Sequence, residues 1–241
     1  GDAREAALLT VHGRMVGFLE AFAIEEAVLC HFAPELKDTL PEAISRYVLG
    51  TQVTIDDVSD EMGLVLVAGQ GYEELAHGHA VGPLVHPTDS LGIPAAYLWV
   101  GHSDVQALLM ALESRGARPA SEEELEAIRI ANGRARWGRD MDEKSFPQEA
   151  LIDERAVHYD KGCYVGQEAM AKIHFRGKVN RTLRRLQADG ALSAGADVIL
   201  GEETVGTVTS ASDGRALALL RYTVEPGASV SVAGTVARVI E

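Results

Sequence analysis

Apolar and polar positions follow a strand pattern in the first part of the chain and a helical pattern soon after it. Residues 6–11 and 15–23 are mostly apolar and are separated by the turn His12-Gly13-Arg14, which is typical of a β-hairpin. Between residues 34 and 49 the apolar positions recur every three or four residues and stop at Gly50. This spacing predicts a helix.

A second hairpin is predicted further along the chain. Residues 52–58 and 63–68 are rich in β-branched and aliphatic side chains, which fit a pleated sheet. The segment 69–94 is rich in glycine, histidine and proline. It therefore predicts only a short helix and a strand.

A strand and two helices are predicted next. Residues 97–100 form the strand, and residues 103–115 have their leucines on one face of an amphipathic helix. Ser121 with Glu124 three positions later is a capping box, which begins the second helix. Asn132-Gly133 is suited to end that helix.

The pattern changes near residue 181, and we expect two domains. Residues 1–180 alternate strands with helices and form an α+β body, whereas residues 181–241 hold short strands separated by glycine turns, as in a small β-barrel or sandwich. Asp213-Gly214 suits a tight hairpin turn whose two central residues have positive φ. The predicted strands of this second domain are 198–200, 205–209, 216–220 and 230–240.

Charge and composition exclude several classes of protein. With 22 Lys and Arg against 36 Asp and Glu, the formal net charge is −14, which argues against a direct nucleic-acid partner. The longest nearly apolar stretch, residues 93–101, is far shorter than the roughly 20 residues of a membrane helix. Cys30 and Cys163 form no disulfide framework, so we expect a cytoplasmic protein. No metal-ligand set is recognisable, so no metal site is predicted.

Much of the candidate chemistry lies in one segment, the octapeptide of residues 161–168, Lys161-Gly162-Cys163-Tyr164-Val165-Gly166-Gln167-Glu168. It combines a thiol, a phenol, an amide and a carboxylate with two flexible glycines. Lys161, two positions from Cys163, favours the reactive thiolate. Two interpretations stay open: a reactive thiol, or a buried and inert cysteine.

A basic run without acidic residues follows the octapeptide. Charge-assisted hydrogen bonds from such a cluster hold an anionic tail, such as a glutamate carboxylate or a phosphate. Alternatively, the cations protect an exposed edge strand, or residues 172–185 dock an acidic partner. The run contains Lys172, Arg176, Lys178, Arg181, Arg184 and Arg185.

A second basic group surrounds Trp137. Arg129, Arg134, Arg136 and Arg139 are its members. The indole of Trp137 either stacks on a flat heterocycle or fills the core.

The octapeptide, followed by Arg176-Gly177 and Asn180-Arg181, resembles the signature of the YgfZ-like, folate-binding branch of the glycine-cleavage T-protein (aminomethyltransferase) family. The resemblance covers most of the chain. It also includes residues 46–49 and 53–58 and, upstream of the signature, Arg129-Ile130, Gly133, Gly138, Asp140-Met141-Asp142 and Pro147-Gln148-Glu149.

The resemblance implies an α+β body of two ferredoxin-like halves around a central folate channel, closed by a C-terminal β-barrel. It implies tetrahydrofolate as the ligand and a role in assembling or repairing iron–sulfur enzymes, including those that modify tRNA. Family members also have a first strand and helix before a stretch like residues 1–10, and we expect these to be missing here.

The resemblance and the side-chain chemistry together predict the site. Cys163 is the predicted redox or cluster-contacting thiol. The hairpin acid of aminomethyltransferases is absent from residues 15–19, and Ala131 stands where many relatives carry a glutamate for the pterin. A tetrahydrofolate-binding accessory protein is therefore favoured over the alternative, an aminomethyltransferase. The predicted folate contacts are Lys161, Tyr164, Gln167, Glu168, Lys172, Arg176, Arg129 and Trp137.

Overall fold

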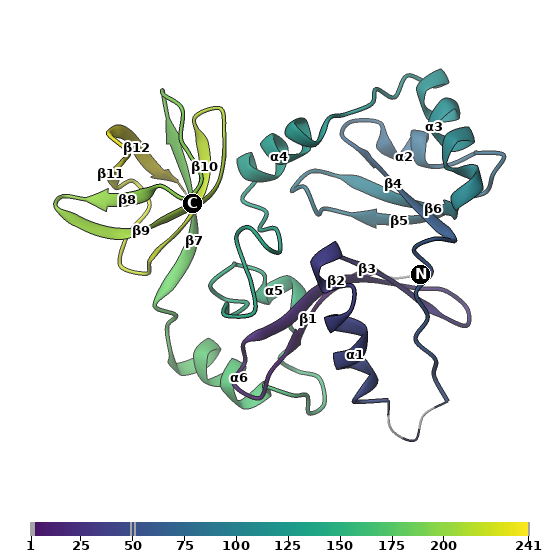
Figure 1. Cartoon of the computed structure of the whole chain (residues 1–241), viewed down its shortest axis with the longest axis horizontal. Helices are drawn as coiled ribbons and strands as arrows, with labels where there is room; N and C mark the ends of the chain where they lie inside the picture. The colour runs from purple at the N-terminus through teal and green to yellow at the C-terminus, as the bar shows by residue number, and fades with distance from the viewer. Residues whose placement is uncertain (1–2, 49, 51, 241) are drawn as a thin grey trace.

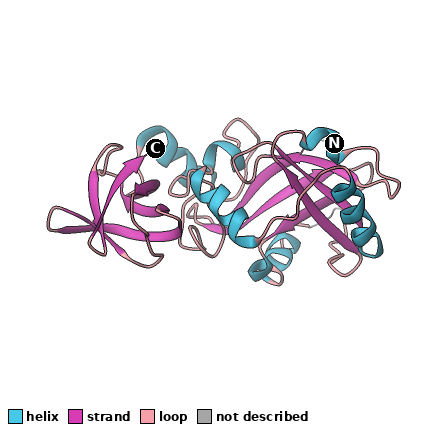
Figure 2. Cartoon of the chain, turned by 90° about the horizontal axis from the view of Figure 1, so that it is seen from above, coloured by secondary structure: helices cyan, strands magenta, loops and turns pink. Residues whose placement is uncertain are grey.

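The computed structural model describes residues 3–48, 50 and 52–240, with the side chain of Arg176 outside the described part. It contains two three-stranded antiparallel sheets and a closed six-stranded barrel (Figure 1). The barrel lies at one end of the long axis and the two sheets at the other, with helices between and around them (Figure 2). The predicted α+β class is confirmed. In the described residues no helix is long and apolar enough to cross a membrane.

The first sheet contains the predicted hairpin. Strands β1 (Ala3–Leu9) and β2 (Met15–Ala23) pair antiparallel, and β3 (Val28–Phe32) pairs with the other edge of β2. The third strand was not predicted, although Val28, Leu29, Cys30 and Phe32 are apolar; the run is only five residues long.

The helix predicted over residues 34–49 is wrong in its extent. A short 3-10 helix, η1 (Pro34–Leu36), precedes α1 (Thr39–Ser45). Pro41 has no N–H to donate to the carbonyl four residues earlier, so a continuous helix through this point would lose a hydrogen bond. In the first turn of α1 the same proline costs little.

The second sheet has the order β4-β6-β5, formed by β4 (Met62–Ala68), β5 (Leu84–Thr88) and β6 (Ala95–Gly101). Its core includes Leu98 and Leu108, which are fully buried. The predicted short helix and the first amphipathic helix are also present, as α2 (Tyr72–Ala76) and, after the 3-10 turn η2 (His102–Asp104), α3 (Val105–Ser114).

The strand predicted over residues 52–58 is wrong. In its described part the segment adopts no regular structure, and Val53 and Ile55 are exposed. Asp57 instead forms an ion pair with Lys37 of the η1–α1 link at 3.1 Å. A β-branched composition alone does not make a strand, because the strand also needs a partner edge.

Helix α4 (Glu122–Ala131) begins at the predicted capping box. The Glu124 N–H donates to Ser121 Oγ at 3.2 Å, and the Ser121 N–H donates to Glu124 Oε2 at 2.9 Å. Gly133, at φ 72°, follows the helix end as predicted. Two more helices, α5 (Asp153–Ala156) and α6 (Gln167–Arg176), lead to the barrel.

The barrel begins at β7 and closes in the order β10-β7-β12-β11-β8-β9. Asp213 and Gly214 have φ values of 46° and 72°, which confirms the predicted turn. The segment 230–240 forms two strands around a turn at Ala233-Gly234, not one. The barrel strands are β7 (Arg181–Ala188), β8 (Asp197–Leu200), β9 (Glu203–Ser212), β10 (Arg215–Arg221), β11 (Ser229–Val232) and β12 (Thr235–Ile240).

Candidate functional site

The octapeptide forms the loop that begins α6. Its Lys161 and Cys163 are exposed, and the Lys161 ammonium lies 4.8 Å from the centroid of the Tyr164 ring. The Tyr164 ring is half-buried against the core below the first sheet, and burial raises the pKa of its hydroxyl. Gln167 is half-buried and Glu168 is exposed at the first turn of α6. The octapeptide thus presents its thiol and its amine to solvent.

Gly166 of the octapeptide has a packing role. Its φ is +85°, and a Cβ added there would lie 2.6 Å from the carbonyl oxygen of Thr10. A Cβ on Gly13 in the β1–β2 turn would in turn lie 3.1 Å from the Cβ of Ala169. The start of α6 is therefore packed directly against the β1–β2 turn. Only a glycine at residue 166 permits this close approach to Thr10.

Arg129, a predicted folate contact, is 5% exposed and fully engaged with protein groups. Its guanidinium has five N–H donors. They bond to both carboxylate oxygens of Glu126, to Asp140 Oδ2 at 2.7 Å, to Ser210 Oγ at 2.8 Å and to the carbonyl of Arg134. No donor remains for a ligand in this conformation, so we assign Arg129 a structural role.

The Arg129 network joins α4 to the barrel. Asp140 also accepts a hydrogen bond from Ser210 Oγ of β9 at 2.8 Å. Burial alone would raise the pKa of Glu126, but hydrogen bonds from Arg129 and Arg136 lower it to about 2. The Glu126 carboxylate therefore stays ionised at ordinary pH values, and its ion pair with Arg129 is a permanent part of the clamp.

Trp137 fills core space. It is 8% exposed and belongs to the same apolar cluster as Met15, Leu40 and Met141. Stacking of this indole on a ligand would require the cluster to open.

The basic run is divided among several places. Lys172 is exposed on α6, and the Lys178 ammonium lies 4.6 Å from the centroid of the Tyr222 ring. Arg181 Nε lies 3.4 Å from Glu149 Oε1. Arg185 instead reaches α4, where its Nη1 donates to the carbonyl of Ala131 at 2.9 Å. Of these four, only Arg185 lines a groove described below.

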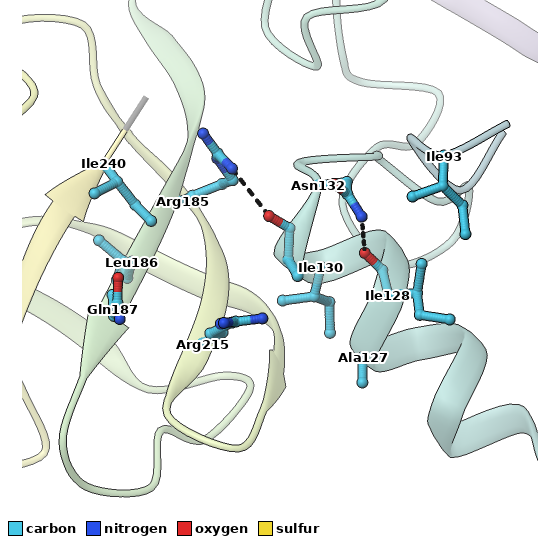
Figure 3. Close-up of a pocket in the computed structure, with 11 residues that line it drawn as sticks. Ile93, Ala127, Ile128, Ile130, Asn132, Arg185, Leu186, Gln187, Arg215 and Ile240 are labelled. Carbon is cyan, nitrogen blue, oxygen red and sulfur yellow. Dashed lines mark hydrogen bonds between the residues drawn. The ribbon is translucent and has the colours of Figure 1, made fainter. Parts of the chain in front are cut away.

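A groove of about 570 Å³ lies between α4 and strands β7, β10 and β12 of the barrel (Figure 3). Isoleucines form its apolar part, and arginines and amides form its polar part. Asn132 is held by a hydrogen bond from its side-chain amide to the carbonyl of Ile128 at 2.8 Å. The lining residues are Ile93, Ala127, Ile128, Ile130, Ala131, Asn132, Arg185, Leu186, Gln187, Arg215 and Ile240.

Arg215 supplies the available positive charge of this groove. Its side chain is exposed and makes no hydrogen bond or ion pair with other described residues. A smaller groove of about 330 Å³ continues past Arg215 to the β9–β10 turn at residues 212–214. The arrangement suits a flat, partly apolar molecule with an anionic end.

The sequence analysis missed a cluster of ionisable groups between the two sheets. Glu20 of β2 is 7% exposed and accepts a hydrogen bond from Thr88 of β5 at 2.9 Å. His31 of β3 and His86 of β5 lie on either side of its carboxylate. The one signal in the sequence is a single carboxylate in the otherwise apolar segment 15–23. Among the described residues, no group of three or more His, Cys, Asp or Glu is placed to hold a metal ion.

Comparison with known proteins identifies relatives of both parts of the chain. Residues 181–240 match the family model described as the CAF17 C-terminal beta-barrel domain. A putative chloroplastic transferase of Arabidopsis thaliana is 21% identical over 235 residues, which cover 89% of this chain and 54% of the relative. The aminomethyltransferase of Rubrobacter xylanophilus is 27% identical over 186 residues, covering 68% of this chain and 50% of the relative.

A solved structure has the same fold. The glycine cleavage system aminomethyltransferase T from Bartonella henselae superposes with a TM-score of 0.80 at 17% identity, over all of this chain and 75% of that one. This chain spans about half the length of the curated relatives named above. The matches confirm the resemblance: the chain ends in a CAF17-type barrel and is distantly related to the aminomethyltransferases.

Proposed function

We propose that this relative of the aminomethyltransferases with a CAF17-type barrel is a cytoplasmic tetrahydrofolate-binding accessory protein. In this proposal it supports the assembly or repair of iron–sulfur enzymes and, through them, tRNA modification. The observation that carries the folate part is the groove between α4 and the barrel, which joins an apolar slot to two arginines. Ala131, where many relatives carry a pterin-binding glutamate, lies in the wall of this groove.

The groove fits the parts of a folate. Its volume of about 570 Å³ lies within the usual range of small-molecule sites, about 300–1,000 Å³. Ile128 and Ile240 offer an apolar surface for a flat ring, and the side-chain amide of Gln187 offers polar contacts. The carboxylates of the glutamate tail would bind Arg215, with Arg185 beside them. Bound tetrahydrofolate would supply one-carbon chemistry, and this chain would orient it.

The order of strands and helices in the second sheet is that of a ferredoxin-like unit. Elements β4, α2, β5, β6 and α3 occur in the order of the first five elements of a βαββαβ ferredoxin-like unit. The sheet order β4-β6-β5 agrees with this arrangement. We propose that the two sheets are the two ferredoxin-like halves of the family fold.

In this proposal the octapeptide contacts a partner protein and not the folate. Cys163 is exposed at the start of α6, where its thiol is accessible to an iron–sulfur enzyme or assembly protein. The two grooves described above are lined by other residues. We therefore place the folate at the barrel, and propose the exposed thiol as a transient redox or cluster contact.

An aminomethyltransferase is the second candidate, favoured by the fold match. Against it, Gly17 and Phe18 occupy the hairpin positions where the family's catalytic acid is expected. Turnover with an aminomethyl-loaded carrier protein would reverse this ranking.

Arg215→Ala tests the folate site. We expect calorimetric titration with (6S)-5-formyltetrahydrofolate to show binding to the wild type and an affinity about 10- to 100-fold lower in the variant. This is the usual effect of losing one charge-assisted hydrogen bond, about 1.5–3 kcal/mol.

Arg221→Ala is the matched control. Arg221 is an exposed arginine at the other end of β10, paired with Glu203 at 2.8 Å and outside the groove. Its affinity should equal that of the wild type. If Arg215→Ala bound the folate as tightly as the wild type, or if the wild type did not bind it, the groove would not be the folate site.

A further inference from the structure

Glu20 is a buried carboxylate at the contact between the two sheets. Phe22, two residues along β2, stacks on the His86 ring of β5 with centroids 4.9 Å apart, and this contact closes one side of the pocket around Glu20. On another side the His31 ring lies 4.4 Å from that of Tyr97 on β6. Glu20 is therefore enclosed by rings from both sheets and is screened from water.

The carboxylate has few partners in this enclosure. Its only hydrogen bond among the described residues comes from the neutral hydroxyl of Thr88. His31 Nε2 lies 3.7 Å from Oε1, and His86 Nε2 lies 3.9 Å from Oε2. Both distances are too long for a hydrogen bond. An ionised carboxylate with a single neutral donor is costly to bury.

The two imidazoles also lack partners. His31 Nε2 and both ring nitrogens of His86 are buried with no hydrogen-bond partner in the described structure, and the same holds for Trp99 Nε1. A protonated Glu20 can donate its O–H to a neutral imidazole nitrogen after a closure of less than about 1 Å. That hydrogen bond would satisfy a nitrogen that now has no partner.

The other charged groups near the cluster oppose one another: Glu5 and Asp89 raise the pKa of Glu20, and Arg155 lowers it. Glu5 of β1 is paired with Arg155 of α5 at 2.6 Å, and Arg155 lies 3.8 Å from Asp89. Asp89 is itself paired with Arg134. These groups compensate one another and leave no cation in contact with Glu20. The remaining polar neighbour, Tyr97, donates to or accepts from Ser90 at 3.1 Å.

We propose that Glu20, His31 and His86 form a proton-binding site between the two sheets, with a single proton held on Glu20 and shared with an imidazole nitrogen. When the proton is shared with His86, it joins β2 of the first sheet to β5 of the second; when it is shared with His31, it joins β2 to β3 within the first sheet. The site makes the contact between the sheets sensitive to pH.

The direction of the pH effect follows from the environment of each group. Burial raises the pKa of Glu20 to about 7, although the Thr88 hydrogen bond lowers it. Burial lowers the pKa of His31 to about 4, and that of His86 is lowered for the same reason. A raised carboxyl pKa stabilises the fold fully below about pH 4.5, and this stabilisation is lost as the pH rises through 7. The neutral His31 acts in the opposite direction between about pH 4 and 6.5, and the neutral His86 has an effect of the same sign as His31.

The test compares urea denaturation of the wild type and Glu20→Gln between pH 5 and pH 8. Glutamine keeps the shape and can still donate a hydrogen bond, but it does not titrate. We expect the unfolding equilibrium constant of the wild type, relative to the variant, to rise roughly 50- to 100-fold over this range. The control Glu26→Gln removes an exposed carboxylate from the β2–β3 turn, and its profile should parallel that of the wild type.

Parallel profiles for Glu20→Gln and the wild type would overturn the proposal. If the variant does not fold, NMR titration of the wild-type histidine rings decides. We expect the ring of His31 to stay neutral down to pH 5.5, and an imidazolium signal from either His31 or His86 at pH 6.5 would place the proton elsewhere. Neither experiment contains folate, so its outcome is independent of the proposed function.

Discussion

Replacing Arg129 with methionine is expected to lower the free energy of unfolding by about 3–5 kcal/mol, the usual cost of leaving a buried charge without its partner. Asp140 has a fully buried side chain, and its Oδ2 lies 2.7 Å from Arg129. Methionine fills a similar space but donates nothing. The barrel would then lose its main polar connection to α4. Urea denaturation followed by tryptophan fluorescence measures the effect.

Arg136→Met is the control for this experiment. Arg136 also pairs with Glu126, at 2.8 Å, but its side chain is 45% exposed. Ion pairs in solvent contribute about 1 kcal/mol or less, so this variant should lose much less stability. If Arg129→Met and Arg136→Met lost equal free energies of unfolding, burial of the Arg129 ion pairs would add nothing to stability.

The second large effect is expected at Gly166. Gly166→Ala should lose about 3 kcal/mol or more, because the alanine Cβ would lie 2.6 Å from the Thr10 carbonyl oxygen and φ is +85°. The left-handed conformation alone costs a non-glycine residue about 1–2 kcal/mol, and the contact requires α6 to move. Thermal and urea denaturation both report this loss.

Gly162→Ala is the matched control within the octapeptide. A Cβ at Gly162 would have no atom within 4 Å, so the change should alter stability by less than about 0.5 kcal/mol. A similar loss in both variants would contradict the packing role of Gly166. A selective loss would show that Gly166 is required by the fold.

Features set by neighbouring residues were predictable from the sequence. The capping box of Ser121 and Glu124 and the turn at Asp213-Gly214 need only a few adjacent residues. Helix α1 differs from its prediction for an equally local reason, the missing N–H of Pro41. The periodicity of apolar positions did not contain that information.

Features that depend on distant contacts were not predictable in this way. Residues 52–58 have a strand composition, but a strand also requires a partner edge. The groove at Arg215 exists only because the barrel packs beside α4. Arg129 carries a charge suited to a ligand, yet the fold uses every donor for the clamp. Glu20 gains Thr88 and His86 from a second sheet, and Thr88 lies 68 residues later in the chain.

The most direct test of the folate site is a crystal structure of the protein with (6S)-5-formyltetrahydrofolate. We expect the ligand between α4 and the barrel, with its glutamate carboxylates within hydrogen-bond distance of Arg215. Ligand density against Lys161 and Tyr164 of the octapeptide, or between the two sheets, would contradict the groove as the folate site.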